Sequence, residues 1–281
     1  MPDVKKSPAD SGLDGQTSEV GLGARVRVPG DCTFFHITHS KAASQWIRRL
    51  LQELFGSAVV EPEHDARQVW ARPIETGRVY ACFNVGRSEF EIIPAPGKSR
   101  FFVLIRDLRD TLVSAYYSLR YSHETQTGQL AYYRWLLSRM DLPTGLAFLA
   151  ETWLNSVAWV QRSWLQAGAP VFKIEECISN PSQKLGAIFR DHWGLDVAPP
   201  LLEEAVQRHS FSILAGGRAP GQEDRGSHYR KGVAGDWRNH FTVELARRFE
   251  HLYGDMLLLA GYETKKGWSD RTIVGDHVGT L

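Results

Sequence analysis

Three separated segments of this chain combine basic side chains with small residues, a composition suited to binding phosphate groups. In the first, Lys41 precedes Ser44 and Gln45 at the expected start of a helix. Helix N–H groups, an ammonium and two side-chain donors form an anion site, and Ala42 and Ala43 let the anion approach the backbone. The segment lacks the GxxxxGK(S/T) pattern of a Walker A loop. A solvated loop lysine is the alternative interpretation.

A second candidate anion site pairs Arg106, directly after an apolar run, with Ser114 eight residues later. If a helix begins between them, two turns separate the side chains and place them on a similar face, where both can hold one anion. The alternative is a set of exposed ion pairs among Arg106, Asp107, Arg109 and Asp110.

The third segment, residues 228–242, is basic and contains Arg230, Lys231 and Gly232. A flexible, basic segment of this kind can wrap a phosphate, although charged runs usually face solvent. The apolar Trp237 and Phe241 indicate instead a segment held against the core.

The strands and helices that must position these segments follow from the hydrophobic pattern. Apolar and β-branched runs predict strands at 32–38, 78–83, 101–105 and 171–174. Helical spacing predicts helices across 46–55, 112–119, 153–165, 181–192 and 242–259. This alternation predicts an α/β fold: one domain with a central, mostly parallel sheet and helices on both faces. Ligands bind such sheets at the C-terminal ends of the strands, where the first two segments fall.

Composition limits the function classes further. The chain has 281 residues, with 33 Lys+Arg against 32 Asp+Glu and a formal net charge of +1. This balance argues against a nucleic-acid-coating surface. No apolar run approaches the roughly 18 residues of a membrane span, and residues 1–30 lack a secretory signal, so no membrane insertion is expected. The distant Cys32, Cys82 and Cys177 predict no disulfide framework, no metal site and a cytoplasmic location.

In this order, the three segments resemble the cytosolic sulfotransferase family, whose donor is 3′-phosphoadenosine 5′-phosphosulfate (PAPS). Residues 38–46, T-H-S-K-A-A-S-Q-W, correspond to the family's T-Y-P-K-S-G-T-T-W, and residues 106–117 match its arginine and following serine. Residues 230–242 reproduce R-K-G-x-x-G-D-W-K-N-x-F-T with Arg238 in place of lysine. The resemblance covers about residues 32–262. We expect a P-loop-kinase-like sulfotransferase domain over 30–265, a flexible arm over 1–29 and a polar tail over 266–281.

The resemblance implies roles for individual residues. Lys41 would be catalytic, at the bridging oxygen of the donor, and Arg106 with Ser114 would hold the 3′-phosphate. Trp46 and Phe211 would stack on the adenine, with core packing as the alternative for both. The implied donor-binding set is Lys41, Ala42, Ala43, Ser44, Gln45, Trp46, Arg106, Ser114, Ser210, Phe211, Arg230, Lys231 and Gly232.

The family's catalytic base, which takes the proton from the acceptor, has no counterpart at the corresponding position of this sequence. The histidine of the family's K-T/S-H-L stretch falls at Asn84, which cannot usefully accept a proton. Other sulfotransferase branches place an acidic base shortly after the first helix, so Glu63 or His64 is our candidate catalytic base. An acidic surface turn is the alternative, and His36 and His123 remain substitutes.

The resemblance implies in-line sulfuryl transfer from PAPS, without a metal, to a hydroxyl or amine of a small, partly hydrophobic molecule, releasing 3′,5′-bisphosphoadenosine (PAP). The aromatic segment 121–149 is a candidate acceptor lid, or else packs between helices. The family's dimer motif, K-x-x-x-T-V-x-x-x-E, ends at Arg247 instead of glutamate, so a monomer or weak homodimer is expected. A nucleotide-binding protein that has lost its base, or a P-loop-type kinase, are the alternative functions.

Overall fold

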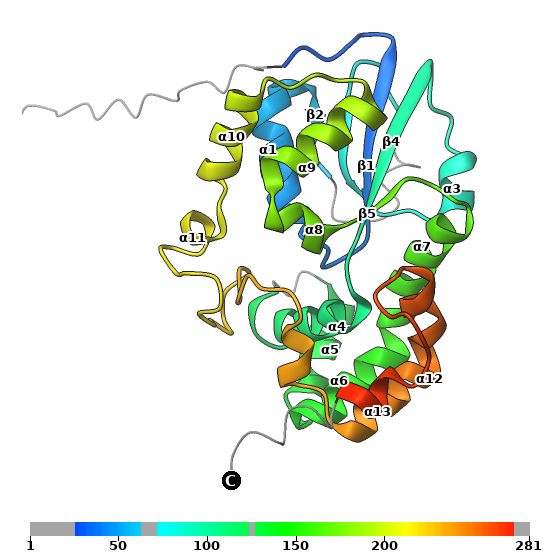
Figure 1. Ribbon diagram of the computed structural model, residues 1–281, viewed down its shortest axis with the longest axis vertical. Coiled ribbons are helices and arrows are strands. Elements are labelled where there is room, and N and C mark those ends of the chain that lie inside the picture. Colours follow the sequence, from blue (N-terminus) through cyan, green and yellow to red (C-terminus); the bar gives the residue numbers. More distant parts are fainter. Residues whose placement is uncertain (1–25, 63–71, 124–126, 273–281) are drawn as a thin grey trace, which may run out of the picture.

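The computed structural model describes residues 26–62, 72–123 and 127–272 (Figure 1). In these residues five strands form one sheet in the order β2-β3-β1-β4-β5, and each of the pairings is parallel. The strands are β1(Cys32–Thr38), β2(Val59–Val60), β3(Val79–Phe83), β4(Lys98–Ile105) and β5(Val171–Lys173). All seven residues of the central β1 are buried, as expected for a parallel strand covered on both faces. The predicted α/β architecture is confirmed.

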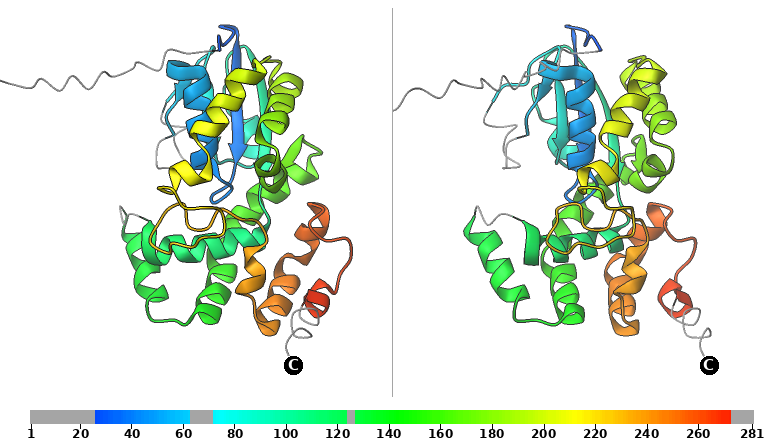
Figure 2. Two further views of the ribbon diagram at one scale, coloured as in Figure 1. Left: turned by 60° about the vertical axis from the view of Figure 1, so that its left-hand side comes forward. Right: turned by 90° about the vertical axis from the view of Figure 1, so that its left-hand side faces the viewer.

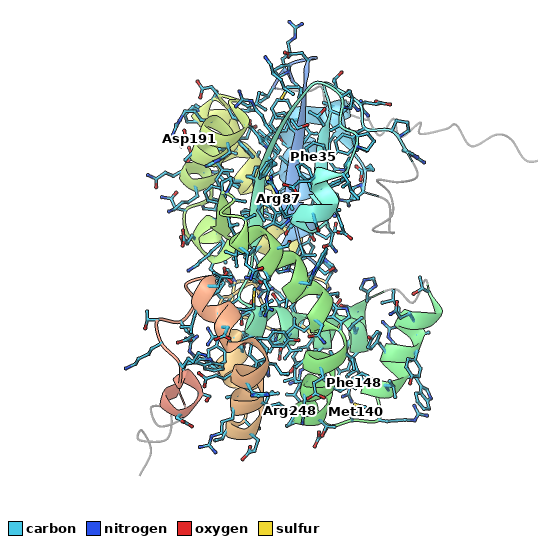
Figure 3. All side chains as sticks on the ribbon, turned by 90° about the vertical axis from the view of Figure 1, so that its right-hand side faces the viewer. Phe35, Arg87, Met140, Phe148, Asp191 and Arg248 are labelled. Atoms are coloured by element: carbon cyan, nitrogen blue, oxygen red, sulfur yellow. The ribbon has the colours of Figure 1, made fainter. Side chains whose placement is uncertain are left out.

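Successive side chains of a strand point to opposite faces of the sheet. Both faces therefore present apolar side chains, and helices cover both. Phe34 of β1 faces one layer and its neighbour Phe35 faces the other. The Phe34 layer holds α1(Ser44–Phe55), α8(Ile174–Ser179), α9(Pro181–Ile188) and α10(Pro199–Arg208), with the short turns η1(Gly56–Ala58) and η3(Phe189–Trp193). The Phe35 layer holds α3(Arg87–Glu91) and α7(Leu154–Gln166), and Figure 3 labels Phe35 and Arg87 on this side.

A second group of helices lies beyond the C-terminal ends of the strands and has its own core (Figure 2). It contains α4(Leu108–Tyr117), α5(Gly128–Leu137), α6(Leu142–Thr152), α12(Val243–Leu259) and α13(Trp268–Thr272), with the turns η2(Ser118–Ser122) and η4(Asp236–Asn239). The segment that carries α11(Phe211–Leu214) and the third basic motif crosses between these helices and the sheet.

Several segments differ from the sequence-based expectation. The two-residue β2 and the short α3 and α8 are too brief to carry a recognisable period. Trp268 is 1% exposed and packs on Trp237, so the packed part of the chain extends past residue 265. At the other end, the Val26 N–H donates to the Leu54 carbonyl, before the expected start at residue 30. None of the helices in the described ranges is long and apolar enough to cross a membrane.

Candidate active site

The loop between β1 and α1 holds Lys41 in an unusual backbone conformation. Lys41 has φ 70° and Ala43 has φ 54°, both in the left-handed region that non-glycine residues rarely occupy. Such strained residues cluster at ligand-binding sites. The Lys41 ammonium donates to the Ser118 hydroxyl at 2.6 Å. Desolvation, followed by the nearby charge of Arg106, lowers the pKa of Lys41 to about 8.

Among the described residues, the Lys41 ammonium therefore contacts the neutral hydroxyl oxygen of Ser118 and not a carboxylate. A desolvated charge is normally compensated by an opposite charge. Because Ser118 supplies only a hydroxyl, the site around Lys41 favours an incoming anion. The resemblance-based assignment of Lys41 to a phosphate or sulfate group is consistent with this geometry.

His39 joins the first basic segment to the second. Its Nε2 accepts the Arg106 backbone N–H at 3.2 Å, so its Nδ1 carries the proton and donates to the Ser40 carbonyl at 2.9 Å. Burial lowers the pKa of His39 to about 4, although the Ser40 carbonyl opposes the shift and Arg106 adds to it. The imidazole is neutral, which keeps both bonds. The Arg106 guanidinium also donates to the Lys41 carbonyl at 3.0 Å.

Ser114 lies on α4, four residues before the Ser118 that contacts Lys41. Residues four apart share a helix face, so Ser114 and Ser118 lie on the same side as the Lys41 ammonium. The structure thus brings together the first two predicted anion segments. η2, which begins at Ser118, is a turn of π-helix, a conformation frequent at functional sites.

The acidic residues near Arg106 tie the site together and are not exposed. Asp107 and Arg109 form a buried pair at 2.7 Å. Asp110 accepts the N–H groups of Gly235 at 2.6 Å and Trp237 at 3.0 Å. The alternative of exposed surface ion pairs is therefore wrong for these carboxylates. Asp110 anchors the third basic segment to α4, a role that the sequence analysis missed.

Asp236 organises the cations of the third segment. Arg230 and Lys231 each donate to its carboxylate at 2.5 Å, and His240 Nε2 lies 3.0 Å away. Burial alone would raise the pKa of Asp236, but the hydrogen bonds from His240, Lys231 and Arg230 hold it well below its usual range. Arg230 also pairs with Glu223. The two cations are thereby held at defined positions.

Gly232 places the third segment directly against Phe211. Gly232 has φ +68°, and a Cβ at this position would lie 2.3 Å from the Phe211 ring. Only glycine permits this approach. Arg218 holds the same segment by donating to the carbonyls of Tyr229 at 2.6 Å and Arg230 at 2.9 Å. Gly232 and Phe211 were both predicted as donor-binding residues from the sequence, whereas no sequence signal pointed to Arg218.

The remaining predicted residues fall in several places. Ala42 is fully buried in the Lys41 loop, and Ser44 and Gln45 begin α1. Trp46 packs partly against the core, which supports packing as one of its roles. Ser210 is the N-cap of α11. Glu63 and His64, the candidate bases, lie outside the described residues.

The substitute bases occupy different environments. His36 is fully buried, its Nδ1 accepts the Cys82 N–H at 3.1 Å, and burial lowers its pKa to about 3. The His36 ring also packs against Phe102 at a tilt, so it belongs to the core. His123 is exposed just after η2. In the parts of the chain that are described, no three His, Cys, Asp or Glu side chains are placed to hold a metal.

Comparison with known proteins identifies the family. A model described as "Sulfotransferase domain" matches residues 97–265. The 3-beta-hydroxysteroid sulfotransferase of Cavia porcellus is 26% identical over 190 residues, which are 60% of this chain and 58% of that protein, so the match spans less than two thirds of this relative. Human Sulfotransferase 1C2 is 21% identical over 255 residues, covering 77% of this chain and 80% of that protein.

A solved structure shares the fold. The crystal structure of mouse sulfotransferase SULT7A1, complexed with PAP, superposes with a TM-score of 0.56 at 18% identity, covering 92% of this chain and 94% of that one. The family model matches more than half of the chain, and it includes Arg106, Ser114 and the third basic segment. The chain therefore belongs to the sulfotransferase family.

Proposed function

We propose that this protein transfers a sulfuryl group from PAPS to a hydroxyl or amine of a small, partly hydrophobic acceptor and releases PAP. The observation that carries the proposal is the partly buried Lys41 ammonium. Among the residues that the structure describes, it meets only a hydroxyl, at 2.6 Å, and the Lys41 carbonyl accepts a hydrogen bond from Arg106. Family membership supports the same activity.

The residues of this site fit a nucleotide with phosphate groups at both ends of its ribose. Lys41 supplies the cation for the 5′-phosphosulfate. Arg106 supplies a cation for the 3′-phosphate, joined by Arg230 and Lys231, which Asp236 holds in place. Phe211 supplies an aromatic face beside Gly232. The proposed donor-binding set is Lys41, Ala42, Ala43, Ser44, Gln45, Trp46, Arg106, Ser114, Ser210, Phe211, Arg230, Lys231 and Gly232.

Lys41 has the chemistry to accelerate the transfer as well as to bind. In sulfuryl transfer, as in phosphoryl transfer, charge accumulates on the oxygen that leaves. An ammonium held beside that oxygen stabilises the transition state more than the ground state, and this difference raises turnover. With a pKa of about 8, Lys41 carries its proton through the neutral range.

A thermal-shift assay tests donor recognition. A ligand that binds only the folded state raises the unfolding temperature, and it does so more the tighter it binds. We therefore expect a larger rise with PAP than with ATP, both without magnesium. A larger shift with ATP would favour the P-loop-kinase alternative. Transfer of labelled sulfate from PAPS to a panel of alcohols, phenols and amines then separates an enzyme from a protein that only binds PAP.

The acceptor, location and assembly belong to the same proposal. A small, partly hydrophobic acceptor fits the cavity of mixed polar and apolar character that lies beside the donor loop. The three cysteines are free thiols, which suits the reducing cytoplasm. Arg247, which replaces the glutamate of the family dimer motif, pairs with Asp270 of its own chain at 3.0 Å, and this supports a monomer or weak homodimer.

A further inference from the structure

A cavity of about 230 Å³ lies beside the donor loop, between the β3–α3 connection and the first half of α7. We name it the Ser40–Glu89 cavity. Six apolar or aromatic residues and four polar residues line it, so its walls are mixed in character. The lining residues are Ser40, Asn84, Val85, Glu89, Ile93, Trp153, Ser156, Val157, Trp159 and Val160. Because Ser40 directly precedes Lys41, the cavity borders the proposed site of sulfuryl transfer.

Specific contacts hold the cavity wall in shape. Gly86 lets α7 approach, since a Cβ there would lie 2.3 Å from the Trp159 ring. The Trp164 indole N–H donates to the Val85 carbonyl at 2.8 Å. The Arg87 N–H donates to the Ser163 hydroxyl at 3.0 Å. These contacts bind the β3–α3 connection to α7, so side chains on it keep a defined position relative to the donor loop.

Glu89 is the one ionisable residue among those that line this cavity. Its Oε2 accepts the Gly86 N–H at 2.9 Å, which directs the carboxylate along the wall. Asn84, at the position of the family histidine, lines the same cavity but has no basic atom. A hydroxyl bound there has one described carboxylate available as a proton acceptor.

We propose that Glu89 is the general base of the transfer, a role that rests on the proposed function. As the acceptor oxygen forms its bond to sulfur, its O–H bond breaks and the proton passes to the Glu89 carboxylate. The bond between sulfur and the bridging oxygen breaks, and its electron pair stays on the phosphate of PAP, beside Lys41. The products are the sulfate ester, PAP and one proton, which Glu89 later releases to water.

The test compares Glu89→Gln with the wild type on phenol and 4-nitrophenol, both small enough for the cavity, near pH 8. Glutamine keeps an oxygen for the Gly86 N–H. Phenol holds its proton at this pH and needs a base, whereas 4-nitrophenol is largely ionised and does not. Because a general base contributes about 100-fold or more, we expect that loss in kcat for phenol and less than about threefold for 4-nitrophenol. PAP affinity is expected to stay unchanged.

Glu91→Gln is the matched control. Glu91 lies on the same short helix, pairs with Arg87 at 2.7 Å and does not line the cavity. Its replacement is expected to leave both rates unchanged.

Three results would overturn the role of Glu89. Equal losses for both phenols would indicate a structural effect. An acceptor-dependent loss in Glu63→Gln or His64→Ala, with Glu89→Gln fully active, would place the base after the first helix. A wild-type protein that binds PAP but transfers sulfate from PAPS to none of the alcohols, phenols and amines of the panel would contradict the proposed function, and the role of Glu89 with it.

Discussion

The donor site and the Ser40–Glu89 cavity are built in opposite ways. The proposed donor site gathers residues that lie far apart in the chain and joins them by hydrogen bonds, such as those between Asp110 and Gly235 and between His39 and Arg106. The cavity forms where one short connection packs against α7, with Gly86 on Trp159. The donor site therefore depends on polar contacts between distant segments, whereas the cavity depends mainly on the close packing of the β3–α3 connection against α7. Substitutions should separate the two.

The largest expected effect is on Arg109, which holds the donor region together. Its guanidinium is buried, pairs with Asp107 and Glu263, and lies 4.1 Å from the Trp237 ring and 4.7 Å from the Trp268 ring. Arg109→Ala removes the cation that faces the buried Asp107 carboxylate, so we expect a loss of about 3–5 kcal/mol in the free energy of unfolding, measured by urea denaturation.

Arg247→Ala is the control for that measurement. Its pair with Asp270 is exposed on both sides and should be worth less than about 1 kcal/mol. Similar losses in the two variants would contradict the idea that buried ion pairs hold the donor site.

Lys41→Ala tests whether the donor site also takes part in the chemistry. Removing the charge at the leaving oxygen should lower turnover of bound PAPS by about 100-fold to 1000-fold, as for the loss of other groups that stabilise transition-state charge. PAP affinity, measured by calorimetry, should fall much less. If turnover of bound donor stays near the wild-type value, Lys41 only binds.

Gly232→Ala should weaken donor binding with a smaller effect. The new methyl group would meet the Phe211 ring at 2.3 Å, so the adenine-side wall must move. We expect a loss in PAP affinity of about tenfold, or about 1.4 kcal/mol.

Gly216→Ala separates this clash from backbone strain. Gly216 also has a positive φ, of +69°, but no atom lies within 4 Å of the position of its Cβ. Equal losses of PAP affinity in the two variants would show that strain alone explains the effect.

The smallest expected effect is a pH dependence with opposite signs for stability and for donor binding. The pKa of Lys41 is lowered in the folded protein to about 8, so above pH 8 the unfolded chain binds more protons at this group. This contribution to the stability of the ligand-free protein rises with pH. PAP affinity should fall over the same interval, because the ammonium loses its charge. Lys41→Arg keeps the charge and should flatten both trends.

Much of the architecture could be predicted from the sequence because the signals are local. β1 has the predicted bounds, and α1 ends before Gly56, which has φ 54°. The third basic segment was identified from consecutive residues. The contacts that position it were missed, since Asp110 lies 125 residues from Gly235 in the sequence and no local pattern relates them. The same holds for His39 and Arg106, which are 67 residues apart.

The sequence by itself determined the family and the alternation of strands and helices, and it indicated which cations form the proposed donor site. These properties depend on residue type and on short spacings in the sequence, and hydrophobic periodicity and motifs reveal both directly. Only the tertiary structure decided which carboxylates are buried partners, how the Lys41 ammonium is left with a neutral neighbour, and which residues border Ser40. Those properties arise from burial and from contacts between distant segments, because desolvation and Coulomb interaction depend on distances that only the folded chain defines.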